Sequence, residues 1–447
     1  MLKWVNDLRK KYQGFLRRGN DPRKKYEGYV EEFANGTIKG WCVDRASPER
    51  PATIRAMFNG RILAMARADR ARTDLAAAAI SKSTGGFEIP LPDLPANAEV
   101  LVVPDGWRTP LARVESVTAH QVKRLKAHSP FYKYIPADIA DDRVNTEMLP
   151  DIGRMAWLDR DDSASLIAAA DKSGYLTPDG VKHCRRFAED GYFVIEGAVS
   201  ERDCDVAWQA FDSWGRTHPE LIGGPVPSQV VPHYGRFLNI HKHVPEMHAL
   251  LHHPVITSAI DTVLGFTCIP FQTIPSYFGS EQLAHSDAIH MATFPLGFLA
   301  AAWIALEDIT PDSGPLVYYP GSHKLPYVLS HDVGIDVREA RTGLDVYHQR
   351  YAPAIAALVR EHQLPAKYFT ARKGDALIWH HNLLHGGSPV NNVNSTRKSL
   401  VCHYFADSAL CYHDLTGSIA DVDSNQPPSA RIIEALRANS RVAVLDN

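Results

Sequence analysis

What this chain of 447 residues lacks already narrows its function. Its six cysteines include no CxxC pair, so we assign none of them to a metal and expect them to be reduced. We find neither a secretory signal nor an apolar run of about 18 residues, which predicts a cytoplasmic protein. The net charge is only −3, so the chain as a whole has no electrostatic attraction to nucleic acid or to an anionic membrane.

Positive charge is nevertheless concentrated at the start of the chain. The first 25 residues carry nine Lys or Arg against two Asp, with apolar residues at near-helical spacing. This basic amphipathic segment, assigned to residues 1–26, has three interpretations that the sequence leaves open. It lies on the anionic inner membrane as a peripheral anchor, it contacts a protein partner, or it packs on its own chain with a solvated charged face.

Composition and length predict two folded units. Hydrophobic residues make up 45% of the chain and charged residues 22%, as in ordinary globular proteins. In residues 27–115, short runs in which apolar and polar residues alternate are separated by turn residues. The runs 53–58 and 61–66 flank Asn59-Gly60, a strong hairpin signal because Asn and Gly tolerate the positive φ of a tight turn. We therefore predict a small β-sandwich domain here.

The turn-rich strings of this domain resemble β-sandwich modules found beside bacterial glycosyltransferases and methyltransferases. The strings are residues 28–31, 40–44, 68–75 and 86–90. The resemblance suggests a function connected with glycans. Trp41 and Trp107 are candidates for a sugar-binding face, although aromatic residues in so small a sandwich more often belong to the core.

The second unit is predicted to cover residues 176–447. Residues 116–175 show no clear pattern of helix or strand, and we expect a linker with some helix. An amphipathic helix then runs from Thr177-Pro178 through Phe187, followed by a strand over residues 191–195. Ser200 and Asp203 form a helix-capping pair that begins the next helix.

The tripeptide His285-Ser286-Asp287 carries the strongest chemical signal of the second unit. Side chains at i and i+2 of a strand project from the same face, so we expect a strand here and one metal ion between His285 and Asp287. The tripeptide alone is weak evidence. A chain with 21 histidines contains such patterns by chance, and His218-Pro219-Glu220 is one of them.

The strings that follow give the tripeptide its context. A buried strand over residues 302–306 leads into a turn over 307–315, a second strand over 316–319, and then Pro320-Gly321-Ser322-His323-Lys324. This order, with the opening string at 190–196, resembles the phytanoyl-CoA dioxygenase family of Fe(II)/2-oxoglutarate oxygenases. The resemblance covers about residues 176–408.

The resemblance implies which residues hold the iron. The family's second iron histidine follows a strand that we expect at residues 373–379, and it falls at His385 rather than at His380 or His381. Those two histidines are better explained by polar packing or by hydrogen bonds around the site. The resemblance also places Trp303 along the co-substrate pocket, where a core tryptophan is an equally good interpretation.

Arg397 and Ser399 suit the distal carboxylate of 2-oxoglutarate. A guanidinium pairs with a carboxylate through two parallel hydrogen bonds, and Ser399 faces the same way in a strand expected over residues 396–405. The ligands His285, Asp287 and His385 leave about half of an octahedral Fe(II) shell open, so that O2 and an organic acid bind side by side.

These patterns predict a mainly β fold with flanking helices, in which the second unit is a double-stranded β-helix, the jelly roll of cupin-like enzymes. Residues 325–370, with a helix over 346–362, form a long insertion of the kind that often acts as a lid. We expect substrate choice there and in residues 218–250. In the latter segment, solvated loop residues are an equally good interpretation of the polar cluster His233, Tyr234, Arg236, His241, Lys242 and His243.

The sequence therefore predicts an Fe(II)/2-oxoglutarate-dependent dioxygenase that uses O2 to hydroxylate a small or carrier-linked bacterial metabolite. The N-terminal module suggests a sugar or a surface-polysaccharide intermediate. Halogenation is disfavoured, because Asp287 occupies the position where halide would bind. No adenine or phosphate fingerprint supports acyl-CoA as the substrate. Two alternatives remain, a cupin-like metal enzyme that does not use 2-oxoglutarate and a non-catalytic protein that binds a glycan or a partner.

Overall fold

The computed structural model describes residues 25–34, 37–58, 61–72, 75–76, 84–91, 99–105, 111–115, 125, 129–136, 144–218, 237–340 and 345–420. These residues belong to two compact units, one within 1–124 and 136–143 and the other within 125–135 and 144–447. Most of the basic segment, the turn Asn59-Gly60, Trp107, and the loop residues His233, Tyr234 and Arg236 lie outside the described residues.

The first unit contains two four-stranded antiparallel sheets, which confirms the predicted β-sandwich. One sheet has the order β1 (Tyr26–Ala34), β2 (Thr37–Asp44), β6 (Thr84–Pro90) and β5 (Arg70–Ala71). The other has the order β4 (Arg61–Arg67), β3 (Thr53–Phe58), β7 (Glu99–Pro104) and β8 (Ala112–Glu115). Strands β3 and β4 pair as the predicted hairpin, with Thr53 opposite Arg67.

Apolar side chains from both sheets form the core of the first unit. Ile38 and Phe87 from one sheet pack with Ile54 and Val102 from the other. Trp41 is only 3% exposed and packs with Val43 and Leu75, so it belongs to the core. Of the two tryptophans considered for a sugar-binding face, the described one is therefore not available as a surface platform.

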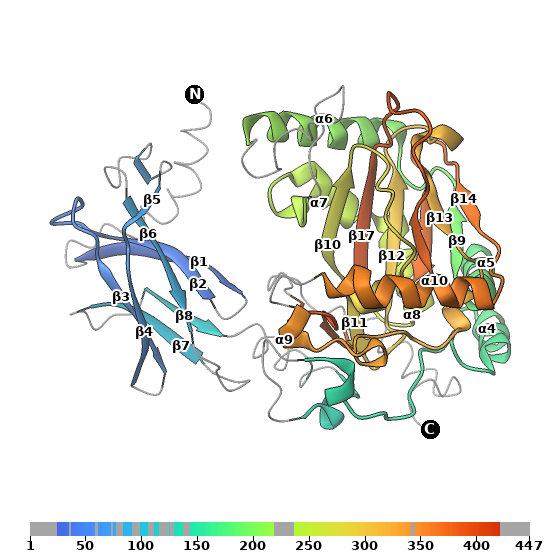
Figure 1. Ribbon diagram of the computed structural model, residues 1–447, viewed down its shortest axis with the longest axis horizontal. Coiled ribbons are helices and arrows are strands. Elements are labelled where there is room, and N and C mark those ends of the chain that lie inside the picture. Colours follow the sequence, from blue (N-terminus) through green and yellow to red (C-terminus); the bar gives the residue numbers. More distant parts are fainter. Residues whose placement is uncertain are drawn as a thin grey trace. The chain divides into compact units, whose positions relative to one another are not determined.

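The second unit is built on a larger sheet that faces a smaller one. The larger sheet has five antiparallel strands in the order β10 (Cys268–Ser276), β17 (Ser399–Ala406), β12 (Leu299–Ala305), β15 (Ala376–His380) and β9 (Tyr192–Ile195). The smaller has the order β14 (Lys367–Phe369), β13 (Leu316–Tyr318) and β16 (His385–Gly387), and β11 (Ala292–Phe294) pairs with β18 (Leu410–Tyr412). Figure 1 shows β10, β17 and β12 side by side in this unit.

Helices flank these sheets. They are α4 (Ser163–Lys172), α5 (Pro178–Asp190), α6 (Glu201–Thr217), α7 (Pro245–Leu251), α8 (Pro254–Leu264), α9 (Val337–Ala340) and α10 (Ala352–Glu361). The predicted cap is confirmed, since Ser200 accepts the N–H of Asp203 at the start of α6. Thr177 caps α5 in the same way by accepting the N–H of Gly180. A π-helical turn, Tyr347–Tyr351, leads directly into α10 and with it forms the helix predicted within the insertion.

Short 3-10 turns connect these elements. They are Tyr132–Tyr134, Thr146–Met148, Ile240–Lys242, Asp287–Ile289, Pro311–Ser313, Ser322–Lys324 and His331–Val333. In the part of the chain that the structure describes, no helix is both long and apolar enough to cross a lipid bilayer.

The core between the two sheets fixes the position of the site. All seven residues of β12 are buried, because β12 lies between β17 and β15 and is covered on both faces. Trp303, Leu377 and Trp379 from the larger sheet pack against Leu316 and Tyr318 from the smaller one. This packing of two antiparallel sheets is the arrangement predicted for a jelly roll.

The second unit begins earlier than the predicted boundary at residue 176. Helix α4 and the preceding segment 144–162 belong to it, although they were expected in a linker. Trp157 explains the difference, since its ring is buried and its Nε1 donates to the carbonyl of Val263, 2.9 Å away in α8. The pattern of apolar residues within this segment did not predict its contact with residues about a hundred positions downstream.

Candidate active site

Backbone pairing brings the two histidines of the predicted metal site together. His285 and His385 form an isolated antiparallel bridge, in which each N–H donates to the other residue's carbonyl at 2.9 Å. Such a doubly bonded pair places the two Cα atoms about 5.5 Å apart. The glycines after His385 permit this approach, because a Cβ at Gly386 would lie 2.6 Å from the Gln282 carbonyl oxygen.

The same local contact orients both imidazole rings. Nδ1 of His285 lies 2.9 Å from the carbonyl of Leu283, and Nδ1 of His385 lies 2.9 Å from the carbonyl of Leu383, in each case two residues earlier. A carbonyl only accepts, so both Nδ1 atoms carry a proton, and in the neutral form of each ring Nε2 keeps the lone pair. This is the tautomer in which histidine binds a metal through Nε2.

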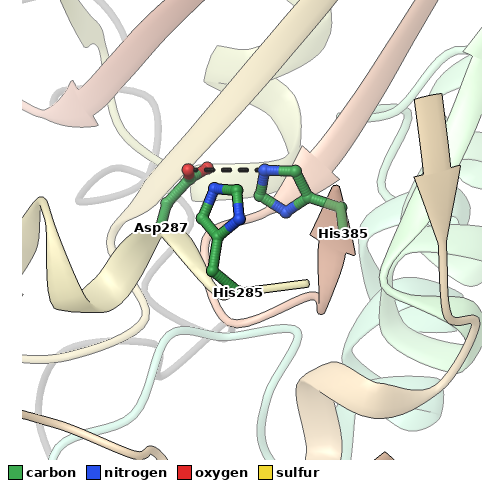
Figure 2. A group of neighbouring side chains, drawn as sticks. All are labelled: His285, Asp287 and His385. Atoms are coloured by element: carbon green, nitrogen blue, oxygen red, sulfur yellow. Dashed lines mark ion pairs between the residues drawn. The ribbon is translucent and has the colours of Figure 1, made fainter. Parts of the chain in front are cut away.

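Asp287 completes a group of three buried ligands (Figure 2). Its Oδ1 lies 3.5 Å from Nε2 of His385, and one ligand atom from each residue lies within 4.8 Å of the other two. Cis ligands of an octahedral ion with bonds of about 2.1 Å are about 3 Å apart. The geometry therefore fits a single metal ion with small adjustments of the side chains.

The backbone between His285 and Asp287 differs from the predicted strand. His285 has bridge pairing and Ser286 is extended, but Asp287 begins the 3-10 turn Asp287–Ile289. The Asp287 carbonyl accepts the N–H groups of His290 and Met291, which turns the chain away from the sheet. The two side chains converge because of this turn, and not because they share one face of a strand.

One hydrogen bond and one nearby imidazole face the second carboxylate oxygen of Asp287. Nε1 of Trp379 donates to Oδ2 at 2.9 Å, and Nε2 of His403 lies 3.7 Å from the same atom. Burial raises the pKa of Asp287, but His385 and His403 outweigh this effect and keep the pKa well below its ordinary value. Burial lowers the pKa of His285 well below its ordinary value, and His385 adds to that shift. The site thus offers one carboxylate and a neutral imidazole, the forms that bind a metal.

The three ligands open onto a cavity of about 640 Å³ between the two sheets. This volume is typical of sites for small molecules. Trp303, Leu316 and Val401 contribute apolar surface, and Ser276, Gln282 and Glu281 contribute polar surface. Arg397 lies in the same cavity as the metal ligands.

Arg397 is a buried cation that meets no acidic side chain among the described residues. Its Nη1 donates to the carbonyl of Gly314 at 3.1 Å, and its Nε has no hydrogen-bond partner there. The guanidinium lies 5.6 Å from the ring centroid of Trp303. Burial lowers the pKa of Arg397 to about 10, so this group stays positively charged at neutral pH.

Ser399 is also buried, and its hydroxyl has no hydrogen-bond partner among the described atoms. It begins β17, whereas Arg397 lies just before the strand and continues the pairing through its N–H to the Tyr277 carbonyl. Val401, two residues beyond Ser399, lines the cavity, but Ser399 itself does not. Ser399 is thus buried between two cavity residues of the chain without being part of the lining itself.

Sequence reasoning missed several cavity residues. His403 is buried, lines the cavity beside Asp287, and follows Arg397 and Val401 at even spacing along β17, so the alternation of that strand could have identified it. Trp379 also lines the cavity but gave no sequence signal beyond its strand. From the insertion, Tyr347 and His348 reach the cavity, in agreement with the expectation that residues 325–370 contribute to it.

The other candidate histidines lie elsewhere. His380 lies 3.3 Å from Asp159, and His381 packs near Tyr327, as the predicted role in polar packing requires. In the segment 218–250, His241 and Lys242 belong to a 3-10 turn outside the cavity lining, and His241 bonds to Thr273. The described part of that segment therefore contributes no cavity residue.

The chain is similar to several known proteins. One similar protein is a probable phytanoyl-CoA dioxygenase of Caenorhabditis elegans, 30% identical over 142 residues, or 31% of this chain and 41% of that protein. Another is the peroxisomal phytanoyl-CoA dioxygenase of Bos taurus, 26% identical over 253 residues, or 52% of this chain and 70% of that protein. This chain thus spans less than half the length of the first of these relatives.

Solved structures of similar chains include the α-ketoglutarate-dependent carbocyclase SnoK from nogalamycin biosynthesis, with a TM-score of 0.41 and 19% identity over 56% of this chain and 96% of that one. EctD from S. alaskensis with bound Fe has a TM-score of 0.39 and 21% identity over 50% and 75% of the two chains.

A family model identifies the second unit. Residues 187–399 match the model of the phytanoyl-CoA dioxygenase family, and this range includes the three metal ligands and Arg397. Together, the match and the ligand set support a dioxygenase with an iron site. The chain therefore carries a domain of the phytanoyl-CoA dioxygenase family.

Proposed function

We propose that the protein is an Fe(II)/2-oxoglutarate-dependent dioxygenase that uses O2 to hydroxylate a small or carrier-linked metabolite. One observation carries the proposal. A single cavity contains three convergent metal-ligating atoms and a buried guanidinium with a free hydrogen-bonding nitrogen. A metal site alone would fit many cupin-like proteins, and the added buried cation favours an anionic co-substrate.

Iron would be held by Nε2 of His285, Nε2 of His385 and a carboxylate oxygen of Asp287. These residues fit the ion because both Nε2 atoms have lone pairs and the site is buried. When bound, iron with 2-oxoglutarate supplies the oxidation of a substrate C–H bond, coupled to decarboxylation of 2-oxoglutarate to succinate. Trp379 keeps Asp287 oriented by its hydrogen bond to Oδ2.

Arg397 would bind the distal carboxylate of 2-oxoglutarate. Its unpaired charge inside the protein costs free energy that an anion offsets, and its Nε is available as a donor. Trp303 lies close to the guanidinium and forms a wall of the co-substrate pocket. Ser399 would add a hydroxyl to the same anion, because its Oγ is buried without a partner.

The substrate would enter from the part of the cavity formed by the segment 276–283 and by Tyr347 and His348 of the insertion. Apolar residues such as Phe278 and Trp303 limit the access of water to the ligands. A sugar or a surface-polysaccharide intermediate is our preferred substrate class, on the resemblance of the first unit to modules beside glycosyltransferases. Cytoplasmic location and the membrane or partner contact of residues 1–25 stay predictions.

Succinate release tests the proposed reaction. The purified full chain is supplied with Fe(II), O2 and 2-oxoglutarate and is screened against nucleotide sugars, lipid-linked glycans, amino acids and acyl-CoAs. We expect succinate formation that rises with one class of compound and a product heavier by one oxygen. If the protein binds Fe(II) but converts a compound without consuming 2-oxoglutarate, the cupin-like alternative is correct. If it binds neither Fe(II) nor 2-oxoglutarate, the enzyme assignment is wrong.

A further inference from the structure

A hydroxyl from the insertion contacts the residue between the first two metal ligands. Tyr351 is fully buried at the end of the π-helical turn, and its hydroxyl accepts the N–H of Ser286 at 3.0 Å. The same oxygen lies 3.2 Å from Oγ of Ser286. Ser286 is the single residue that links the bridged His285 to the 3-10 turn at Asp287, so this contact fixes the point where the backbone changes direction.

The same turn reaches the first metal ligand by a second route. Tyr347 packs on Tyr351 with ring centroids 5.2 Å apart, and it stacks on His290 at 5.2 Å. His290 in turn meets the ring of His285 edge-on at 5.6 Å. Tyr347 and His290 line the cavity, so an occupant of the outer cavity touches the element that supports the ligands.

The apolar side of the turn packs beneath both ligand segments. Tyr351 shares one buried cluster with Ile289, which follows Asp287, and with Leu384, which precedes His385. Val346 and Ile355, on either side of the π turn, belong to the same cluster. A π-helical turn at this place is notable because such turns are rare and occur frequently at functional sites.

We propose that the π turn Tyr347–Tyr351 is a positioning element of the metal centre, with Tyr351 acting through Ser286 and Tyr347 through His290. The inference rests on the proposed function for the identity of the metal. Without the Tyr351 hydroxyl, the buried N–H of Ser286 loses the acceptor that it has at 3.0 Å, and an unsatisfied buried donor is unfavourable. The protein relieves this cost by rotating the peptide before Asp287, and the carboxylate then moves away from His285 and His385.

Binding of Co(II), which stands in for Fe(II) and has a visible spectrum sensitive to ligand geometry, tests this role in the full chain. We expect Tyr351→Phe to lower the affinity for Co(II) by about 10-fold, as for other partners that orient metal ligands, and to alter the spectrum. Tyr404→Phe is the matched control. Tyr404 is equally buried, and its hydroxyl donates to the Leu251 carbonyl at 3.0 Å, on the other side of β17 from the cavity residues.

The outcomes separate this inference from the proposed function. Wild-type affinity and spectrum in Tyr351→Phe would overturn it, as would an equal loss in Tyr404→Phe, which would indicate general loosening. If Tyr351→Phe does not fold, Tyr347→Leu decides the question, with a loss of about 3-fold in affinity supporting the role and no loss overturning it. Failure of the wild type to bind Co(II) or Fe(II) would instead contradict the proposed function.

Discussion

Two groups of buried histidines and aspartates lie in the second unit, and only one can hold a metal. The first, which we call the metal group, consists of His285, Asp287 and His385. The second, which we call the Asp159 cluster, consists of Asp159, His323, His380 and His381. Both combine imidazoles with one carboxylate, and all six histidine and aspartate side chains other than Asp159 are at least nine-tenths buried. Composition and burial therefore do not distinguish them.

The direction of the ring nitrogens makes the difference. In the metal group, each Nδ1–H is bonded to the carbonyl two residues earlier, so both Nε2 atoms point to one place. In the Asp159 cluster, Nδ1 of His380 accepts the N–H of Asn382 and Nε2 donates to Asp159, so both of its nitrogens are occupied. The metal group is the one set of converging ligands among the described residues. A metal site thus requires backbone acceptors that orient its histidines.

The largest expected effect comes from removing the carboxylate of each group. Asp287→Ala deletes a ligand, and we expect the affinity for Fe(II) to fall by more than about 100-fold, beyond the effect of losing a supporting partner. Asp159→Asn should leave that affinity within about 2-fold, because Asp159 is not among the converging ligands. Anaerobic titration with Fe(II) measures both. Equal affinities in Asp287→Ala and wild type would remove the basis of any iron role.

The next largest effect should separate binding of the co-substrate from binding of the metal. Arg397→Ala should raise the 2-oxoglutarate concentration for half-maximal succinate release by about 10- to 100-fold, since charge-assisted hydrogen bonds contribute about 1.5–3 kcal/mol. The Fe(II) affinity should change little, because Arg397 is not one of the three ligands. Arg397→Lys keeps the charge and should have an intermediate effect. Unchanged half-saturation in Arg397→Ala would refute the assignment of this residue.

Local pattern was enough to predict much of this molecule. The hairpin β3–β4, the start of α5 and the cap of α6 follow from residues within a few positions of one another. The central strand β12 was visible as an apolar run. His285, Asp287 and His385 were predicted as metal ligands from motif order, and the structure brings these three residues together in an arrangement that could hold a metal ion.

Contacts between distant segments were not visible in the sequence. His285 pairs with a residue one hundred positions later, and this bridge, with the turn at Asp287, replaces the predicted strand. Trp157 ties the supposed linker to α8, and Tyr351 reaches back to Ser286. Each of these contacts is a hydrogen bond to one particular backbone group. The periodic pattern of apolar residues in a sequence does not predict such a bond.

A smaller effect should follow from removing a donor to the carboxylate of the proposed metal site. Trp379→Phe keeps the ring in the core but removes the N–H that bonds to Oδ2 of Asp287 at 2.9 Å. We expect a loss of about 10-fold in Fe(II) affinity, as for other hydrogen-bond partners of metal ligands. Trp157→Phe is the control, because its N–H bonds to the Val263 carbonyl, away from the metal group. If both variants lose affinity equally, the effect of Trp379 is on general packing.

The smallest expected effect concerns the Asp159 cluster and the pH dependence of stability. Burial, with the neighbouring His380, lowers the pKa of His323 from 6.5 to about 3. Below about pH 6.5 this residue takes up a proton in the unfolded chain but not in the folded protein. Its contribution to the free energy of unfolding is therefore fully present above about pH 6.5 and is lost progressively as the pH falls toward about 3. The free energy of unfolding should decrease by about 1.4 kcal/mol per pH unit from this group alone.

Urea unfolding at pH 6.5 and 4.5 checks this slope. His323→Gln removes the titrating group, so its free energy of unfolding should fall less between these two pH values than that of the wild type. His362→Gln, at an exposed position after α10, should keep the wild-type slope. A wild-type slope in His323→Gln would mean that this imidazole takes up its proton in the folded protein as readily as in the unfolded chain. Burial in the Asp159 cluster would then impose no cost on the charge of His323, and the expected pH dependence of this cluster would be wrong.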